Sequence, residues 1–272
     1  MNSYVHGYAD REARRLRDQA DTLAELLHAD SRFPPGVSIL EAGCGVGAQT
    51  VTLAAQNPDA KITAIDVAGE SLRLAEQRCL QSGITNVKFE QGDIFDLSYP
   101  DASFDVVFVC FVLEHLAAPV EALRELLRVM KPEGTIWVIE GDHGSAFFHP
   151  DSTSARAAIE CQVSLQAAAG GNANIGRELY PLMCEAGLIG VTVSPRHVYV
   201  DGSRPQWIEG FTRDTFTAMI EGVRDAALAA GILAAPEFDA GIRDLNRTAQ
   251  TDGVFSYMFF KATGRREALA AR

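Results

Sequence analysis

The sequence predicts an α/β protein: a doubly wound, mostly parallel sheet of seven strands with an antiparallel last strand, an N-terminal helix and a helical lid insertion. Strand-like and helix-like apolar patterns alternate from residue 37 to residue 140, which is typical of a parallel sheet with helices on both faces. The segment 104–110 is apolar on both faces, as expected of a buried parallel strand. Near the C-terminus, two strand-like segments at 188–200 and 254–262 favour an antiparallel pair.

The predicted elements follow from apolar periodicity and from residues that begin or end helices. The first helix, at about 10–29, has leucines at helical spacing and ends before Pro34-Pro35-Gly36. Further helices are predicted at 48–55, ended by Asn57-Pro58, at 69–81, capped by Gly83, from Pro119 onward, at 152–169, at 174–186 and within 206–230. Strands are predicted at 37–40, 61–66, 87–90, 104–110, 135–140, 188–200 and 254–262.

Composition and charge exclude several classes of protein. The chain has 272 residues with 24 Lys and Arg against 36 Asp and Glu, a net charge of −12, so we expect no nucleic-acid partner. No apolar run approaches the roughly 20 residues of a membrane span, and the first ten residues do not resemble a signal peptide. Five cysteines without regular spacing fit a reducing cytoplasm. We therefore expect an acidic cytoplasmic protein without membrane contact, and a homo-oligomer stays open.

The strongest local signal is a glycine-rich turn between a strand and a helix, Glu41-Ala-Gly43-Cys-Gly45-Val-Gly47. Glycines allow a tight turn and let a ligand approach the backbone beside the positive end of the following helix. The glycines alone also match the dinucleotide-binding fingerprint, so a nicotinamide or flavin cofactor stays open at this point. Glu41 argues against a dinucleotide, because a carboxylate there repels a pyrophosphate but suits a ligand that carries an ammonium group.

Two further carboxylates follow neighbouring strands. Asp66 ends the second strand, where a carboxylate accepts both hydroxyls of a ribose or, alternatively, caps the next helix. Asp93 follows the third strand in Gly92-Asp93-Ile94. Its side chain can accept an adenine amino hydrogen while Ile94 packs on the ring, although an ordinary turn would explain this motif if it stood alone.

Together these motifs resemble the class I S-adenosylmethionine-dependent methyltransferases, which have a Rossmann-like fold. The resemblance covers about residues 35–142 and rests on four ordered motifs: EAGCGVG, AIDVA, EQGDIF, and FDVVFVCFVLEHL with VMKPEG after it. Within the superfamily the chain is most similar to the small-molecule branch typified by ubiquinone and menaquinone biosynthesis methyltransferases. The segment from Tyr4 to Tyr8 also resembles an N-terminal segment that folds over the cofactor in some members.

The resemblance implies S-adenosylmethionine as co-substrate and S-adenosylhomocysteine as product. The residues it implies for cofactor binding are Glu41, Gly43, Gly45 and Gly47 at the methionine portion, Asp66 at the ribose, Asp93 and Ile94 at the adenine, Cys110 beside the sulfonium, His115 at the pocket wall, and Val67 next to Asp66. Because the chain has no repeat or linker, we expect one domain over residues 1–272. It comprises an N-terminal lid and helix (1–34), a cofactor-binding half (35–142) and a substrate half (143–272) with a helical insertion at about 202–250.

A methyl transfer needs mainly in-line positioning of the nucleophile, and a base only where that nucleophile must lose a proton. The candidate bases are His143 after the fifth strand, His115, and Tyr8 from the N-terminal lid. A histidine suits this role because its ordinary pKa is near 6.5. His143 is alternatively a turn residue bonded to backbone, and His115 a residue that packs against the cofactor.

Other polar residues near the fifth strand have supporting roles in this prediction. Asp142 or Glu140 is expected to orient the ring of His143. No metal site is predicted, because no second carboxylate cluster follows the fourth strand. His28 and His149 are expected to lie in solvent.

The acceptor is predicted only as a class. The insertion carries Trp207, Phe211 and Phe216, which would form an apolar lid over a small aromatic or otherwise hydrophobic acceptor. Oxygen, nitrogen and carbon all stay open as the methylated atom, including indole carbon in natural-product biosynthesis. Two alternatives remain: a methyltransferase that acts on protein or RNA, and a protein that binds the cofactor without catalysis.

Overall fold

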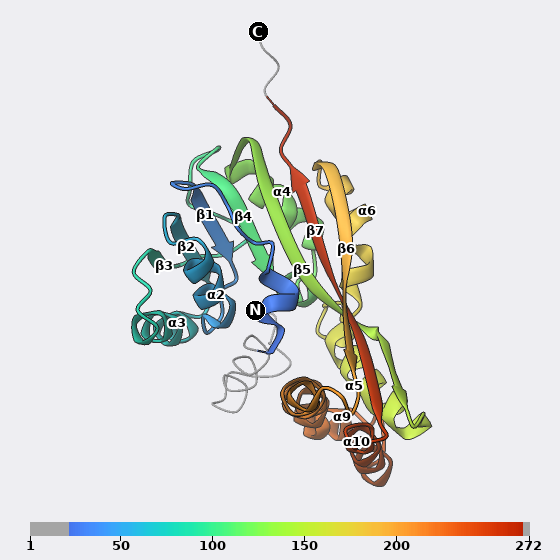
Figure 1. Cartoon of the computed structure of the whole chain (residues 1–272). Helices are drawn as coiled ribbons and strands as arrows, with labels where there is room; N and C mark the ends of the chain where they lie inside the picture. The colour runs from blue at the N-terminus through green and yellow to red at the C-terminus, as the bar shows by residue number, and fades with distance from the viewer. Residues whose placement is uncertain (1–21, 269–272) are drawn as a thin grey trace.

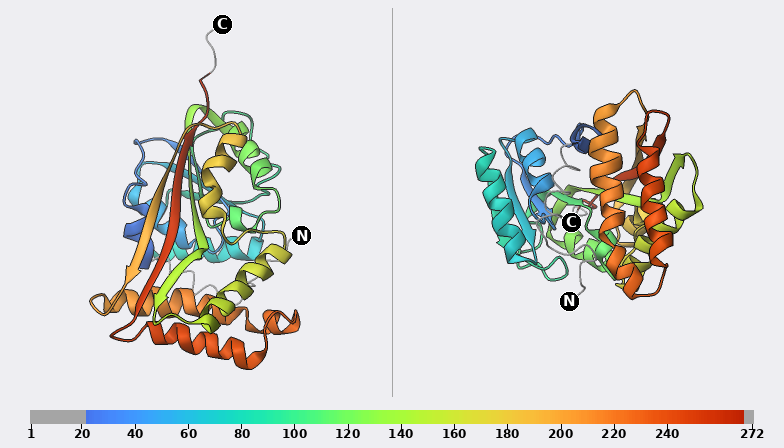
Figure 2. Two further views of the ribbon diagram at one scale, coloured as in Figure 1. Left: turned by 90° about the vertical axis from the view of Figure 1, so that its right-hand side faces the viewer. Right: turned by 90° about the horizontal axis from the view of Figure 1, so that it is seen from below.

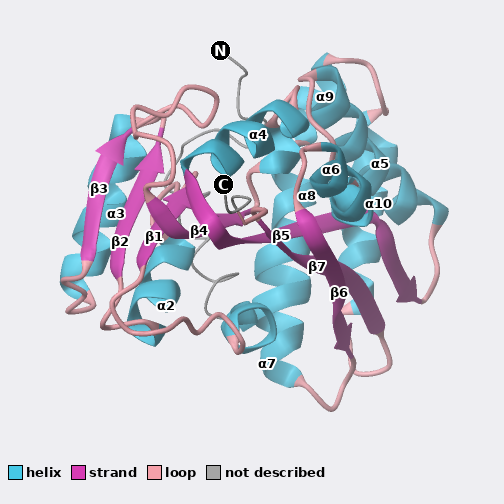
Figure 3. Ribbon diagram, turned by 90° about the horizontal axis from the view of Figure 1, so that it is seen from above, coloured by secondary structure: helices cyan, strands magenta, loops and turns pink. Residues whose placement is uncertain are grey.

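A computed structural model of the chain describes residues 22–268 (Figure 1). Its centre is a seven-stranded sheet in the order β3-β2-β1-β4-β5-β7-β6, which can be followed across Figure 3. Strand β7 pairs antiparallel with β5 and β6, and the remaining neighbours pair in parallel. The strands are β1 (Ser38–Ala42), β2 (Lys61–Asp66), β3 (Val87–Gln91), β4 (Phe104–Cys110), β5 (Met130–His149), β6 (Ile189–Val200) and β7 (Val254–Arg265). The predicted sheet with its antiparallel last strand is confirmed.

Alternating side chains of the central strands form two apolar cores, one on each face of the sheet. On one face, Phe108 packs with α2 (Ala48–Gln56), α5 (Thr153–Ala168) and the helix at 22–28. On the other face, Val107 packs with α4 (Pro119–Val129) and α6 (Leu179–Glu185). A third, small cluster joins Leu72 of α3 (Gly69–Gln81) to β2. Both faces of the parallel part are therefore covered, as the apolar run 106–110 of β4 indicates.

Strand β5 is much longer than predicted. It continues past residue 140 to His149, so His143 lies within a strand and not in a loop after it. The ladder with β7 is interrupted between Asp142 and Phe147 and then resumes. The Gly-Asp-His-Gly-Ser sequence of this stretch is typical of a turn, but pairing with β7 on both sides of the irregularity keeps the chain extended.

The predicted helix at 174–186 is divided in two. Residues Ile175–Glu178 form the 3-10 turn η2, and α6 begins at Leu179. A side chain on Gly176 would have its Cβ 2.7 Å from the Gly141 carbonyl oxygen, so this turn lies directly against the backbone of β5. The close approach explains why the turn departs from a regular helix.

The chain between β6 and β7 forms helices only, as predicted for the insertion. They are α7 (Pro205–Trp207), the π-helical stretch η3 (Ile208–Thr217), α8 (Ala218–Gly222), α9 (Arg224–Ala229) and α10 (Ala235–Thr248). They gather at one end of the molecule, where β5, β6 and β7 lead to them (Figure 2). Helix α10 packs tightly on α5, because a Cβ on Gly241 would lie 2.7 Å from that of Ala158.

The helix at 22–28 is anchored to the sheet by a buried lysine. The Nζ atom of Lys261 lies 2.8 Å from the Leu27 carbonyl oxygen and 2.6 Å from Oδ1 of Asp30. His28, predicted to be solvent-exposed, is fully buried and lies 2.7 Å from Gln49. Burial lowers its pKa to about 4. Among residues 22–268, none of the helices has the length and apolar character that a bilayer crossing needs.

Candidate active site

The carboxyl ends of β1 and β4 point toward the end of the molecule where α5, α9 and α10 gather (Figure 1). In open α/β sheets, ligands bind beyond this edge. The structure brings most of the sequence-predicted site residues together here: Glu41, Gly43, Gly45 and Gly47 at or after the end of β1, Asp66 and Val67 at or after the end of β2, Asp93 and Ile94 after β3, and Cys110 and His115 at or after the end of β4. Tyr8 lies outside the described residues.

The three glycines of the turn after β1 all have positive φ, at 79°, 53° and 74° for Gly43, Gly45 and Gly47. Two of them are explained by packing. A Cβ on Gly43 would lie 2.5 Å from a methyl group of Val112, and one on Gly47 would lie 2.8 Å from Ala75 of α3. The third is different, because a Cβ on Gly45 would meet no atom within 4 Å. Gly45 therefore presents bare backbone to open space, as a ligand cradle requires.

Asp66 fixes this turn. Its Oδ2 accepts a hydrogen bond of 2.8 Å from the Gly45 amide, and its Oδ1 accepts one of 2.9 Å from the Ala68 amide. The carboxylate thus joins the glycine turn to the residue before α3. A carboxylate oxygen can accept a second hydrogen bond, so Asp66 keeps capacity for two ribose hydroxyls.

Glu41 is almost completely buried, at 2% exposure, near the end of β1 and two residues before the first glycine of the turn. Burial raises the pKa of its carboxyl group to about 7, and the nearby Asp66 charge acts in the same direction. Its Oε2 has no hydrogen-bond partner among the described residues. A buried polar atom without a partner is costly, and a cationic or hydrogen-bond-donating ligand group at this point would relieve that cost.

The segment after β3 presents both polar and apolar groups. Asp93 is exposed, and its Oδ1 accepts a 2.9 Å hydrogen bond from the Phe95 amide, as in the simple turn considered above. Beside it, Ile94 is buried while Val67 and Phe95 are 58% and 40% exposed. The segments of Val67 and Asp93 are neighbours, because Gln91 donates to the Val67 carbonyl oxygen at 2.8 Å. Exposed apolar side chains beside a carboxylate suit a planar ring with an amino group.

The chain leaves β4 in a strained conformation. Cys110, the last residue of β4, is buried, and Phe111 follows with a φ of 58°, which is uncommon for a bulky residue and costs about 1–3 kcal/mol. His115 lies in the 3-10 turn η1 (Leu113–His115), with its Nε2 3.6 Å from Oε1 of Glu114. Its side chain is 25% exposed. Of the two histidines considered as bases, His115 is the more accessible.

His143 is buried between the sheet and the insertion. Its Nδ1 lies 3.0 Å from the Ala173 carbonyl oxygen and 3.1 Å from the Tyr257 hydroxyl, and its Nε2 lies 3.4 Å from the sulfur of Met219. A carbonyl oxygen only accepts, so in the neutral ring Nδ1 carries the proton and Nε2 carries the lone pair. Ala173 thereby selects the tautomer in which Nε2 can act as a base.

The expected support of His143 by neighbouring carboxylates is wrong. Asp142 forms two hydrogen bonds with Arg177, at 2.6 and 2.8 Å, and Glu140 accepts from the Val112 and Leu113 amides. Alternation along a strand explains this, since residues 140 and 142 face away from residue 143. No group of three His, Cys, Asp or Glu side chains within residues 22–268 is arranged to hold a metal ion.

A comparison with protein families gives the methyltransferase domain family, whose model matches residues 34–187. The chain belongs to this methyltransferase family. The matched range begins just before β1 and ends just after α6, so it includes every sequence-predicted site residue that the structure describes.

Two curated relatives of this methyltransferase-family chain are themselves named as methyltransferases. The 27-O-demethylrifamycin SV methyltransferase of Amycolatopsis mediterranei is 32% identical over 132 residues, 48% of each protein. The ubiquinone/menaquinone biosynthesis C-methyltransferase UbiE of Ectopseudomonas mendocina is 35% identical over 108 residues, 39% of this chain and 42% of the relative. The chain spans about half the length of the curated relatives it matches.

A solved structure with a similar fold is that of the [4+2]-cyclase SpnF. It superposes with a TM-score of 0.57 and 22% identity, over 92% of this chain and 82% of the cyclase. At this identity the likeness concerns the fold alone. A cyclase with the fold of a methyltransferase also illustrates that reactions are decided by the site and not by the architecture.

Sequence reasoning missed the partners that surround His143 in this methyltransferase-family chain. Tyr257 lies on β7, Ala173 precedes η2 and Met219 lies on α8, so each is brought to His143 from a distant part of the chain. No local signal distinguishes them, because Tyr257 lies in an apolar strand pattern that is typical of core.

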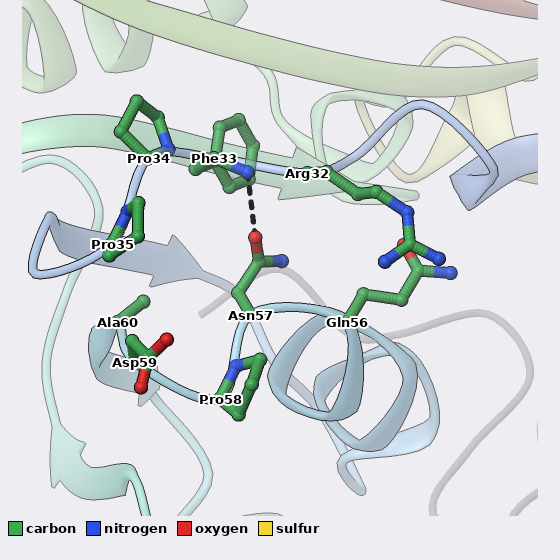
Figure 4. A pocket seen from close by; sticks show the side chains of 9 residues that line it. All are labelled: Arg32, Phe33, Pro34, Pro35, Gln56, Asn57, Pro58, Asp59 and Ala60. Atoms are coloured by element: carbon green, nitrogen blue, oxygen red, sulfur yellow. Dashed lines mark hydrogen bonds between the residues drawn. The ribbon is translucent and has the colours of Figure 1, made fainter.

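A shallow pocket elsewhere is distinct from the candidate site (Figure 4). Its lining includes Pro34 and Pro35 before β1 and Pro58 and Asp59 before β2. It therefore lies at the amino-terminal edge of the strands, opposite the glycine turn. Asn57 holds its two walls together, with Oδ1 accepting from the Phe33 amide at 2.7 Å.

Proposed function

We propose that this chain is an S-adenosylmethionine-dependent methyltransferase that acts on a small, hydrophobic acceptor. The observation that carries the proposal is the pair formed by Glu41 and Gly45 in a chain of the methyltransferase family. Glu41 offers a buried carboxylate oxygen without a partner among the described residues, and Gly45 offers bare backbone in the turn that follows. The ammonium group of S-adenosylmethionine matches Glu41, whereas the pyrophosphate of a dinucleotide would be repelled.

The remaining contacts follow the order of the strands. Asp66 would bind the ribose, and Asp93 with Ile94 would bind the adenine, next to the exposed Val67. Cys110 would lie beside the reacting end and His115 at the wall. The bound cofactor supplies a methyl group that is already activated as a sulfonium. The protein's own residues then have to hold the acceptor in line, exclude water and, where needed, take a proton.

The hydrophobic acceptor is inferred from the aromatic cluster between the insertion and the sheet. Phe216 of η3 lies 4.7 Å from Phe255 and 5.4 Å from Tyr257 between ring centroids, and Phe211 lies 6.0 Å from Phe259. The His143 ring lies 6.2 Å from that of Phe216. An acceptor that reaches His143 would thus meet aromatic walls, which suit an aromatic or otherwise apolar molecule.

His143 is our proposed base for acceptors that must lose a proton. Its Nε2 carries the lone pair, and Met219 beside it comes from helix α8 of the insertion. Met219 is a flexible side chain, so its displacement would open one path toward Nε2. The methylated atom is left as oxygen, nitrogen or carbon, and an indole carbon is one specific candidate.

The acceptor class is tested with labelled S-adenosylmethionine and a panel of matched aromatic acceptors: phenols, anilines and indoles, each with a glycosylated, strongly polar counterpart. We expect label in one or more of the apolar members and at least about tenfold less in their polar counterparts, because the aromatic wall favours apolar surface. Equal labelling of polar counterparts, or label found only in added protein or RNA, would overturn the small hydrophobic acceptor.

A further inference from the structure

The loop that follows β4 is held to β5 by three successive amide groups. The Phe111 amide donates to the Ile139 carbonyl oxygen at 2.9 Å. The next two amides, of Val112 and Leu113, both donate to Oε1 of Glu140, at 3.0 and 2.7 Å. One carboxylate oxygen therefore fixes two consecutive peptide groups at the carboxyl edge of the sheet.

This arrangement is costly for the fold. Glu140 is fully buried, and its Oε2 has no hydrogen-bond partner among residues 22–268. Burial raises the pKa of its carboxyl group well above the ordinary value, and the neighbouring Glu114 raises it further. A buried carboxyl group costs free energy that an apolar side chain of similar size would not. A group of this kind calls for an explanation beyond packing.

The loop that Glu140 holds is part of the candidate active site. Phe111 has its strained positive φ within this loop, and such strain persists only where the surroundings hold it. The side chain of Val112 packs so closely on Gly43 that a Cβ there would come within 2.5 Å of it. The loop conformation therefore sets where the glycine turn lies, next to the position proposed for the sulfonium.

We propose that Glu140 is a positioning residue for methyl transfer: its carboxylate holds residues 111–113 against the glycine turn, so that the donor methyl group and the acceptor are aligned. The expected effect on kcat rests on the proposed function. The hydrogen bonds from the Val112 and Leu113 amides to Glu140 are present in the free protein and can be measured without cofactor or acceptor.

Two variants distinguish the effect of the hydrogen bonds that Glu140 accepts from the effect of its negative charge. In Glu140→Gln the amide oxygen still accepts from Val112 and Leu113, whereas Glu140→Leu has no acceptor. The matched control is Asp142→Asn, because Asp142 lies on the same strand, is also buried and bonds Arg177 instead of the loop. All variants are made in the full chain.

In the leucine variant we expect kcat to fall by about 10- to 100-fold, the scale of a small misplacement of reacting groups. Its affinity for S-adenosylhomocysteine should fall too, because Val112 packs on the glycine turn, but by less than kcat, because Asp66 and Glu41 are untouched. Glu140→Gln should keep kcat within about threefold of wild type, and so should Asp142→Asn even though its melting temperature falls.

Amide hydrogen exchange gives a readout independent of activity. In the wild type the Val112 and Leu113 amides should be protected as well as that of Phe111. In Glu140→Leu the Val112 and Leu113 amides should exchange faster while that of Phe111, which bonds to the Ile139 carbonyl oxygen, keeps its protection. Rapid exchange of both amides in the wild type would overturn the proposal without any variant. Unchanged kcat in the leucine variant, or equal losses of kcat, affinity and melting temperature in it and in Asp142→Asn, would also overturn it. A wild type that binds no S-adenosylhomocysteine would instead refute the proposed function.

Discussion

Replacing Gly45 by valine is expected to abolish detectable binding of S-adenosylmethionine, which means a loss of at least roughly 100-fold in affinity. The valine side chain would extend into the open space beside the Gly45 backbone, where the methionine portion is proposed to lie. Because φ at Gly45 is 53°, the substitution should also cost about 1–2 kcal/mol of stability. Equilibrium dialysis with labelled cofactor measures the first effect and thermal unfolding the second.

Gly83→Val provides the matched control. Gly83 follows α3 and has a φ of 71°, and a Cβ added there would also meet no atom within 4 Å. The substitution therefore carries the same backbone penalty away from the site. We expect a similar loss of stability with unchanged cofactor affinity. If both variants lose affinity equally, Gly45→Val acts through folding, and the proposal that the cofactor lies against the Gly45 backbone is wrong.

Replacing His143 by alanine is expected to lower kcat by about 10²- to 10⁴-fold for an acceptor that must lose a proton, the usual range for removal of a general base. Cofactor affinity should remain unchanged, because the glycine turn and Asp66 lie on other strands. Single-turnover measurements over a range of pH follow the proton loss, and titration with S-adenosylhomocysteine follows the affinity.

His143→Gln distinguishes chemistry from packing. A glutamine fills most of the same volume and can donate to the Ala173 carbonyl oxygen, but it cannot take a proton at neutral pH. Loss of kcat in this variant equal to that of His143→Ala would support the base. Recovery of activity would mean that the ring only packs between Phe216 and Tyr257, and His115→Ala would then be the next variant to measure.

The parallel half of the fold was predictable because its signals are local. Strand β2 and helix α3 have the predicted bounds, since an apolar run ends at Asp66 and a helical stripe ends before Gly83. Strand β5 was not predictable in its full length. Its second half contains turn-like residues, and only pairing with β7, more than 100 residues later in the chain, keeps it extended.

The site shows the same division between local and distant information. The glycine turn, Glu41 and Asp66 are recognisable by their spacing, because each lies at or directly after a strand end. The burial of His28 under the sheet and the pairing of Asp142 with Arg177 depend on contacts between distant segments. A polar residue gives no sign in the sequence of whether such a distant partner exists, so the sequence alone predicts the wrong neighbours for Glu140 and Asp142.

Calorimetric titration of the full chain with S-adenosylhomocysteine and with NAD, at pH 5.5 and pH 7.5, tests the proposed cofactor site most directly. We expect S-adenosylhomocysteine to bind and NAD to give no heat of binding. Below pH 7 the Glu41 carboxyl is mostly protonated and cannot pair with an ammonium group until it loses that proton. Affinity should therefore be about tenfold higher at pH 7.5, and Glu41→Gln should remove the difference. Tight binding of NAD with none of S-adenosylhomocysteine would contradict the assignment.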